Sequence, residues 1–143
     1  MAALCSTAEH CESEVREKLT RAGISTADAD RIIDRLYDED FLNTERYCRA
    51  FVRDKFRYAR WGRVKIGQAL RMKRLPDNEI RRAIDEELPA PEYQALLEHL
   101  VQQKDRTLPD DLDDYARRAK LIRFALSRGF TMDEVLSVVG DVG

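Results

Sequence analysis

Apolar residues recur every three or four positions along most of the chain. One such stripe starts at Leu112 and continues through Tyr115, Ala116, Ala119, Ile122 and Leu126. Sustained alternation of apolar and polar residues, which would indicate β-strands, is almost absent. The pattern therefore predicts an all-α fold with eight helices, over residues 9–22, 26–38, 43–60, 62–73, 77–88, 90–104, 110–128 and 132–140.

The same residue types return three times along the chain, at spacings of 51 and 55 residues. When Ile24, Leu75 and Phe130 are aligned, apolar residues coincide five and nine positions before them and nine positions after them. The next position holds Ser25 in the first copy and Thr131 in the third, and both residue types cap helices well. The second copy has Pro76 there, so we expect Asp77 to cap that helix instead.

Units of this kind bury their apolar faces by stacking on one another. We therefore predict a single domain over residues 1–143, built from three tandem three-helix repeats that form an elongated, curved helical array. The repeats cover about residues 5–60, 61–105 and 109–143, and the last one is truncated after its second helix.

The formal net charge of −2 conceals a strong segregation of charge along the chain. Residues 1–45 carry −6, residues 46–82 carry +10, residues 83–116 carry −8 and residues 117–143 carry +2. A basic block inside an acidic chain favours an anionic partner. The alternative is a set of solvated helix faces whose charges are balanced by acidic neighbours in space.

Arginines in the basic block are spaced so that they share one side of the helix predicted over residues 43–60. Their separations are 3, 4, 4 and 3 residues, and the stripe spans about 21 Å at the usual helical rise. The following helix adds a second group of basic residues. The candidate binding residues are Arg46, Arg49, Arg53, Arg57, Arg60, Arg63, Lys65, Arg71, Lys73 and Arg74. Two interpretations stay open, because these cations could contact a partner or could pair with the acidic flanks of the same chain.

The Trp61-Gly62 pair lies between the two basic helices. A tryptophan beside arginines can stack on a nucleic-acid base. It can equally pack between adjacent repeats, while the glycine allows a tight turn, and we favour this second interpretation.

Catalytic motifs are lacking, so we do not expect an enzyme, and we expect neither a cofactor nor a metal. The acidic run Asp38–Asp40 falls at the end of a predicted helix, and the run Asp110–Asp114 opens another, where carboxylates are favourable against the helix dipole. Cys5, His10 and Cys11 lack a regularly spaced fourth zinc ligand. The chain has neither a long apolar run nor a signal peptide, which predicts a cytoplasmic protein with reduced thiols.

Three segments of the chain, together with the repeat, resemble the RecX family. They are Asp40–Tyr47, Arg60–Leu70 and Phe124–Phe130, and they occur in the family's order on its three-repeat plan. Arg74 stands where the family usually has glycine, so it must accept a positive φ or the helix must end differently. Asn43 replaces a common aspartate but caps a helix about as well.

The resemblance implies a regulator that binds RecA filaments on DNA and restrains strand exchange and ATP hydrolysis. Its expected partners are RecA and single- or double-stranded DNA, with no membrane, and the protein is expected to be a monomer. The family supplies no catalytic residue. Two alternatives are a helical DNA-binding module that acts without RecA and a helical adaptor for another acidic protein.

Overall fold

The computed structural model describes residues 9–140, and this part of the chain is helical throughout, with no β-strand. It contains eight α-helices and one π-helical turn, which confirms the predicted all-α fold. Their bounds are α2 Glu12–Arg21, α3 Thr26–Asp38, α4 Thr44–Asp54, η1 Lys55–Ala59, α5 Arg63–Met72, α6 Asp77–Glu87, α7 Ala90–Thr107, α8 Asp114–Ser127 and α9 Met132–Val139. None of these helices is long and apolar enough to cross a membrane.

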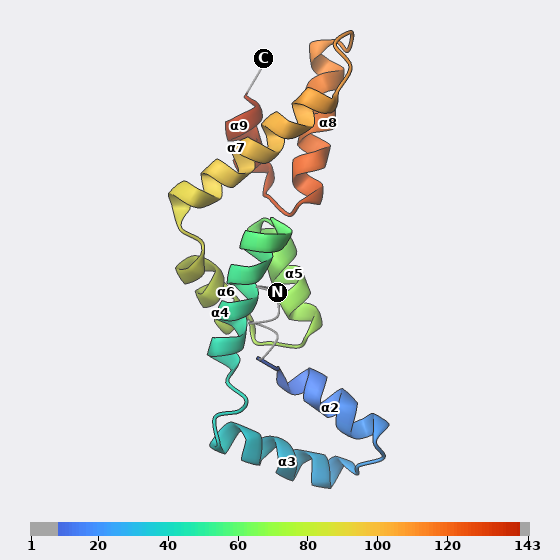
Figure 1. Ribbon diagram of the computed structural model, residues 1–143, viewed down its shortest axis with the longest axis vertical. Helices are drawn as coiled ribbons and strands as arrows, with labels where there is room; N and C mark the ends of the chain where they lie inside the picture. The colour runs from blue at the N-terminus through green and yellow to red at the C-terminus, as the bar shows by residue number, and fades with distance from the viewer. Residues whose placement is uncertain (1–8, 141–143) are drawn as a thin grey trace.

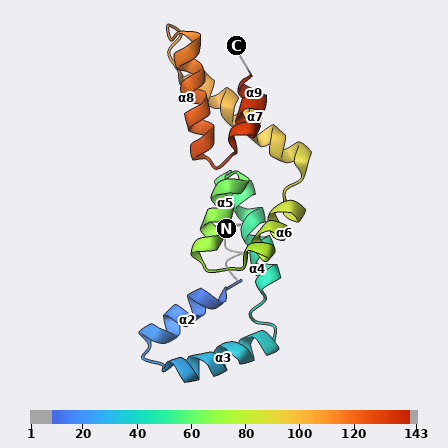
Figure 2. The ribbon, with the colours of Figure 1, turned by 180° about the vertical axis from the view of Figure 1, so that it is seen from behind.

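The helices are stacked in three groups along the long axis of an elongated molecule (Figures 1 and 2). We call these groups the N-terminal unit (α2 and α3), the middle unit (α4, η1, α5 and α6) and the C-terminal unit (α7, α8 and α9), because the closest helix contacts lie within them. The predicted repeats grouped the helices differently. They placed α4 in the first repeat and α7 in the second, whereas in the structure α4 packs with α6 and α7 packs with α8 and α9.

The aligned residues Ile24, Leu75 and Phe130 occupy the same position in three equivalent helix ends. In each, the residue before them has a positive φ, and their backbone N–H donates to the carbonyl five residues earlier, at 3.0, 3.4 and 3.4 Å. This is the Schellman arrangement. Arg74 adopts a φ of 62°, which confirms that the non-glycine residue takes the left-handed conformation there. The repeat in the sequence is thus a repeat of helix ends.

The predicted caps are confirmed at two of the three following helices. Ser25 accepts a hydrogen bond from the Asp28 amide, and Thr131 forms a capping box with Glu134. The prediction for Asp77 is wrong: Pro76 holds the cap position without a side-chain bond, and Asp77 is already the first residue of α6. Its carboxylate accepts instead from Arg71 at 3.2 Å.

Two predicted helices differ locally from the structure. The helix expected over 110–128 starts only at Asp114, because Asp113 caps it by accepting from the Ala116 amide at 2.7 Å. Tyr115 then lies in the first turn and is exposed rather than part of an apolar stripe. The helix expected over 43–60 ends as an α-helix at Asp54 and continues as a π-helical turn.

One continuous core joins the middle and C-terminal units. Ile66 and Leu70 of α5 belong to it together with Leu97, Phe130 and Val135 of the C-terminal unit, and all five are almost completely buried. Of the described residues before Tyr47, only Cys11 belongs to this core. The middle and C-terminal units therefore share a hydrophobic interior from which the N-terminal unit is largely separate.

Backbone contacts fix the junction between these two units. The Gly62 amide donates to the Arg128 carbonyl at 2.8 Å, and the Val64 amide donates to the Gly129 carbonyl at 2.8 Å. A Cβ on Gly62 would lie 2.5 Å from the carbonyl carbon of Gly129. Gly62 has an ordinary φ of −80°, so the expectation that it allows a tight turn is wrong. The glycine is required because another backbone lies against it.

Candidate nucleic-acid and protein interface

The predicted basic residues lie on α4, η1, α5 and the turns that follow the two helical segments. Asn43 starts α4 by accepting a hydrogen bond from the Arg46 amide at 2.9 Å. Tyr47, Cys48 and Val52 are buried on one side of this helix, and the arginines of the stripe lie on the other residues of the same turns. α4 thus carries the first three arginines of the predicted stripe, Arg46, Arg49 and Arg53.

The first part of the stripe is paired with carboxylates of the same chain. Arg46 lies 2.7 Å from Glu9 and 3.0 Å from Asp40. A hydrogen bond from Asn43 and the charge of Arg46 together lower the pKa of the Asp40 carboxyl. This end of the stripe is therefore not an open cationic surface.

Two carboxylates at the end of α6 face the middle of the stripe. Arg49 is bonded to Glu86 and lies 3.8 Å from Glu87 and 3.7 Å from Glu45. Arg53 lies 3.2 Å from Glu87. Intramolecular pairing, one of the two interpretations of the stripe, thus accounts for the contacts of Arg46, Arg49 and Arg53.

The last part of the stripe is open. Arg57 and Arg60 are exposed and form no ion pair with any residue in the described part of the chain. A π-helical turn has an additional residue compared with an α-helical one, so Arg57 does not continue the α-helical spacing. Arg60 follows η1 in the left-handed conformation, with a φ of 58°.

The basic residues of α5 divide in the same way. Arg63 lies 2.9 Å from Glu134 and over the ring of Tyr93, Arg71 pairs with Asp77, and Lys73 lies 3.0 Å from Glu14. Arg74, in contrast, is exposed at the end of the helix without an ion pair among residues 9–140. Arg63 is thus a contact between the middle and C-terminal units.

Trp61 is held between two lysines. The ammonium group of Lys55 lies 4.9 Å and that of Lys65 lies 4.7 Å from the centre of the indole ring. The ring is partly buried against the continuous core, so at least part of it packs inside the molecule, and its packing between adjacent repeats stays a prediction. Its surroundings nevertheless remain cationic.

We define the junction cluster as Lys55, Arg57, Arg60, Trp61 and Lys65. The segment that carries it is held against the C-terminal unit by the hydrogen bond that the Gly62 amide donates to the Arg128 carbonyl, whereas the guanidinium of Arg128 lies over the ring of Phe124 in α8. The sequence singled out Arg57, Arg60 and Lys65 but missed Lys55, which could have been found within the basic block.

The described part of the chain holds no grouping of side chains typical of a metal centre. Within residues 9–140, no three His, Cys, Asp or Glu side chains are close enough together to hold a metal ion. Of the residues considered for zinc, Cys5 lies outside the described residues, and Cys11 is buried with its thiol 3.3 Å from the Ser13 hydroxyl. Electrostatic contact is the chemistry that the junction cluster can provide.

Family models match most of the chain. The models described as the first, second and third three-helix domains of RecX match residues 2–36, 43–84 and 91–139. A regulatory protein RecX from Prosthecochloris aestuarii is 30% identical over 137 residues, covering 90% of this chain and 86% of the relative. One from Clostridium perfringens is also 30% identical, over 129 residues, covering 90% of this chain and 59% of the relative.

Solved structures have the same fold. The crystal structure of RecX from Lactobacillus salivarius superposes with a TM-score of 0.82 at 23% identity, covering 96% of this chain and 90% of that one. A second crystal structure, of a regulatory protein RecX, gives a TM-score of 0.81 at 19% identity, covering 91% and 64%.

Proposed function

Because the chain belongs to the RecX family of regulatory proteins, we propose that it modulates the RecA recombinase by binding RecA filaments assembled on DNA. Proteins of this family regulate rather than catalyse. The chain acts as a monomer in the cytoplasm, and its effect is to restrain ATP hydrolysis and strand exchange by the filament.

The observation that supports a contact surface is the group of open cations around Trp61. Arg57 and Arg60 are exposed and unpaired among the described residues, and Lys55 and Lys65 lie beside the indole. Arginine can bind a phosphate or a carboxylate through two hydrogen bonds. A filament of RecA on DNA offers both kinds of anion, so the junction cluster is the first contact with it.

The remaining candidate residues then have different roles. Arg74 extends the open surface, whereas Arg46, Arg49, Arg53, Arg71 and Lys73 reach a partner only in competition with their own carboxylates. Arg63 holds the C-terminal unit in place through Glu134.

The decisive experiment is an ATP-hydrolysis assay. Purified protein is added to RecA, single-stranded DNA and ATP, and strand exchange is followed in parallel. We expect both activities to fall as the protein approaches stoichiometric amounts. Unchanged activities at these amounts would defeat the proposal.

A charge-reversal variant tests the contact surface. Arg57→Glu/Arg60→Glu should lose most of the inhibition and keep its helicity, because neither side chain makes an ion pair within residues 9–140. Arg31→Glu/Arg106→Glu is the control, since it reverses two exposed charges on α3 and α7. Equal inhibition by the two variants would exclude the junction cluster as the contact.

A DNA-binding module that acts without RecA is the second candidate, and the cationic surroundings of Trp61 favour it. Gel-shift binding to naked DNA, stronger than binding to filaments, would support it over our proposal. Capture of an acidic partner protein without nucleic acid would instead support an adaptor.

A further inference from the structure

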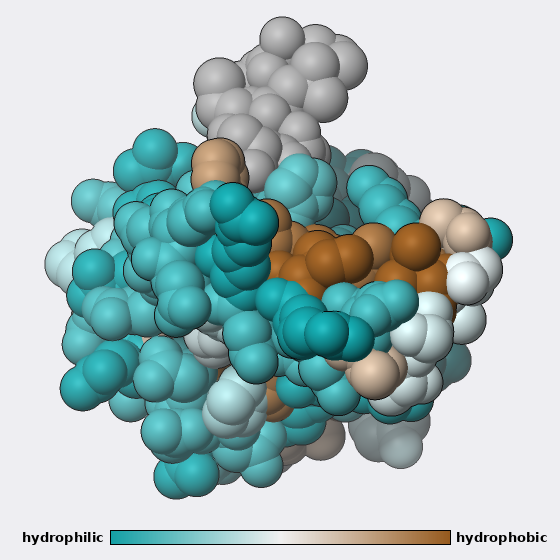
Figure 3. Space-filling view, turned by 90° about the horizontal axis from the view of Figure 1, so that it is seen from below, coloured by the Kyte–Doolittle hydropathy of each residue, from teal (hydrophilic) through white to brown (hydrophobic). Residues whose placement is uncertain are grey.

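The N-terminal unit is attached to the rest of the molecule in a different way from the other two. α2 contains no buried residue, and α3 buries only Ala29 and Ile33, which lie outside the continuous core. Ile24 and Ile32 are more than one-third exposed, and a hydrophobic band is visible on this end of the molecule (Figure 3). Apart from Cys11, which caps α2 and is buried in the continuous core, apolar burial therefore holds this unit only weakly.

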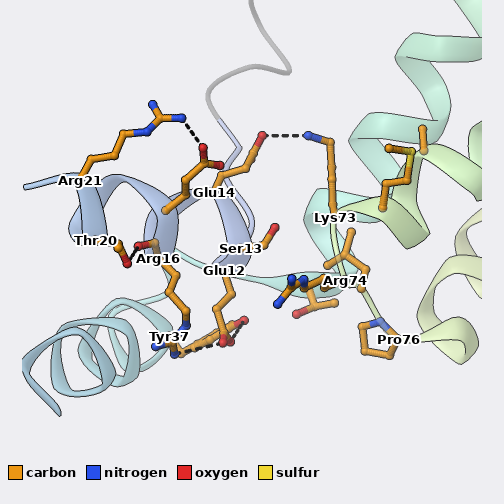
Figure 4. A pocket seen from close by; sticks show the side chains of 15 residues that line it. Glu12, Ser13, Glu14, Arg16, Thr20, Arg21, Tyr37, Lys73, Arg74 and Pro76 are labelled. Atoms are coloured by element: carbon orange, nitrogen blue, oxygen red, sulfur yellow. Dashed lines mark hydrogen bonds and ion pairs between the residues drawn. The ribbon is translucent and has the colours of Figure 1, made fainter. Parts of the chain in front are cut away.

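A groove separates α2 from the end of α5. Its volume is about 1040 Å³, and it is lined on one side by α2 and on the other by the segment from Met72 to Pro76 (Figure 4). The backbones of the middle and C-terminal units, in contrast, are in direct contact at Gly62 and Gly129. The N-terminal unit thus has space in which to move relative to α5.

Two ion pairs bridge the N-terminal segment and the middle unit, and we call them the latch. Glu14 of α2 lies 3.0 Å from Lys73, across the groove in Figure 4, and Glu9 lies 2.7 Å from Arg46. Although partial burial opposes it, hydrogen bonds from Lys73 and the Cys11 amide lower the pKa of Glu14. The Glu14 carboxylate is therefore charged at neutral pH and available for the pair.

The cations of the latch are also candidate binding residues. Arg46 and Lys73 belong to the basic set, and Lys73 also lies 5.9 Å from the centre of the Phe51 ring. Their side chains are 37% and 29% exposed, so a partner can reach them. An anionic group that engages these nitrogens must compete with Glu9 and Asp40 at Arg46 and with Glu14 at Lys73.

We infer that the N-terminal unit is a movable arm, and that a RecA–DNA filament opens it by taking Arg46 and Lys73 from the latch. The inference rests on the proposed function for the identity of the partner. Opening enlarges the basic surface from the junction cluster toward the end of α5. The closed arm accordingly lowers the affinity for the filament.

The test measures the position of the arm by energy transfer between two dyes. They are attached at Ala27 and Gln102, both exposed, through non-canonical amino acids so that the native cysteines remain. The latch variant is Glu9→Gln/Glu14→Gln. Glutamine keeps the capping-box contact that Glu14 makes with the Cys11 amide, so α2 should still form.

The control is Glu12→Gln/Glu17→Gln, which removes the same net charge as the latch variant, from α2 alone. Its carboxylates contact Arg16, Tyr37 and Arg21, all within the N-terminal unit. We expect the latch variant to shift and broaden the energy-transfer distribution in 0.1 M salt and the control to match the wild type. Identical distributions for both variants would overturn the latch.

Adding filaments of RecA on single-stranded DNA completes the test. The wild type should then shift toward the open distribution, and the latch variant should bind about two- to five-fold more tightly than the control, as expected for the loss of a competing, partly exposed ion pair. A parallel experiment with naked single-stranded DNA shows whether phosphate alone is sufficient to open the N-terminal unit. An open latch variant that binds no filament would refute the proposed function but leave the arm intact, whereas filament binding without any shift would refute the arm alone.

Discussion

The contact between Gly62 and Gly129 shows how a single residue can be required for a reason that is invisible locally. Gly62 lies in extended backbone and makes no turn, while the left-handed residue in this segment is Arg60. Glycine is required at this position because the carbonyl group of Gly129, from a distant part of the sequence, lies where a Cβ would be. A sequence pattern reports spacing along the chain and therefore cannot report this approach.

The close backbone contact at Gly62 predicts that adding a single methyl group there lowers the stability of the fold. Gly62→Ala places a Cβ 2.5 Å from a backbone atom, which should destabilise the fold by about 1–3 kcal/mol because the units must separate. Gly67→Ala is the matched control in the same helix, since its Cβ would meet Ile84 at 3.5 Å and alanine favours a helix. Thermal unfolding should show a lower Tm for Gly62→Ala only. Equal Tm values would mean that the units do not touch at Gly62.

At the scale of helices, the sequence predicted the elements well but not what faces them. The Schellman ends at Gly23, Arg74 and Gly129 and the cap at Ser25 depend on neighbouring residues, so the repeat was visible in the sequence. Arg46, Arg49 and Arg53 of the arginine stripe lie on α4 as predicted, whereas Arg57 lies in the π-helical turn and Arg60 follows it. The ion pairs of Arg49 and Arg53 with the end of α6 were not predictable in detail, because helical spacing defines a face and leaves its neighbour undefined.

Because the carboxylates at the end of α6 face the arginine stripe, we predict that removing them strengthens filament binding. Glu86→Gln/Glu87→Gln removes the two α6 carboxylates from Arg49 and Arg53 and leaves Arg49 only the longer pair with Glu45, so binding to RecA–DNA filaments should tighten by about two- to five-fold. Glu92→Gln/Asp111→Asn, which alters two exposed carboxylates, controls for the change in net charge. Fluorescence anisotropy of a labelled protein measures both. If the two variants bind equally, the α6 carboxylates do not shield the stripe.

At the scale of the whole molecule, the near-neutral total charge is the sum of strongly charged segments. The block over residues 46–82 carries +10, and the blocks on either side of it carry −6 and −8. Ion pairs fold part of these acidic flanks onto the basic block. Among the candidate binding residues, Arg57 and Arg60 are exposed beside the junction of the middle and C-terminal units, and Arg74 is exposed at the end of α5, so long-range attraction of an anionic partner should be directed to these positions.

Because the partner is bound through charges, its affinity should fall with salt, and the slope reports the number of phosphate contacts. If the protein engages about four phosphates, the log–log slope of affinity against salt should be roughly −3 to −4, and each lost phosphate contact should reduce it by about 0.7–0.9. Arg57→Glu/Arg60→Glu should therefore flatten the slope for filaments by about 1.5, whereas Arg31→Glu/Arg106→Glu should leave it unchanged. Because an acidic protein groove also responds to salt, the same titration is run on naked DNA. A flattening on both ligands assigns the two arginines to phosphate, a flattening on filaments alone assigns them to RecA carboxylates, and an unchanged slope on both removes them from the interface.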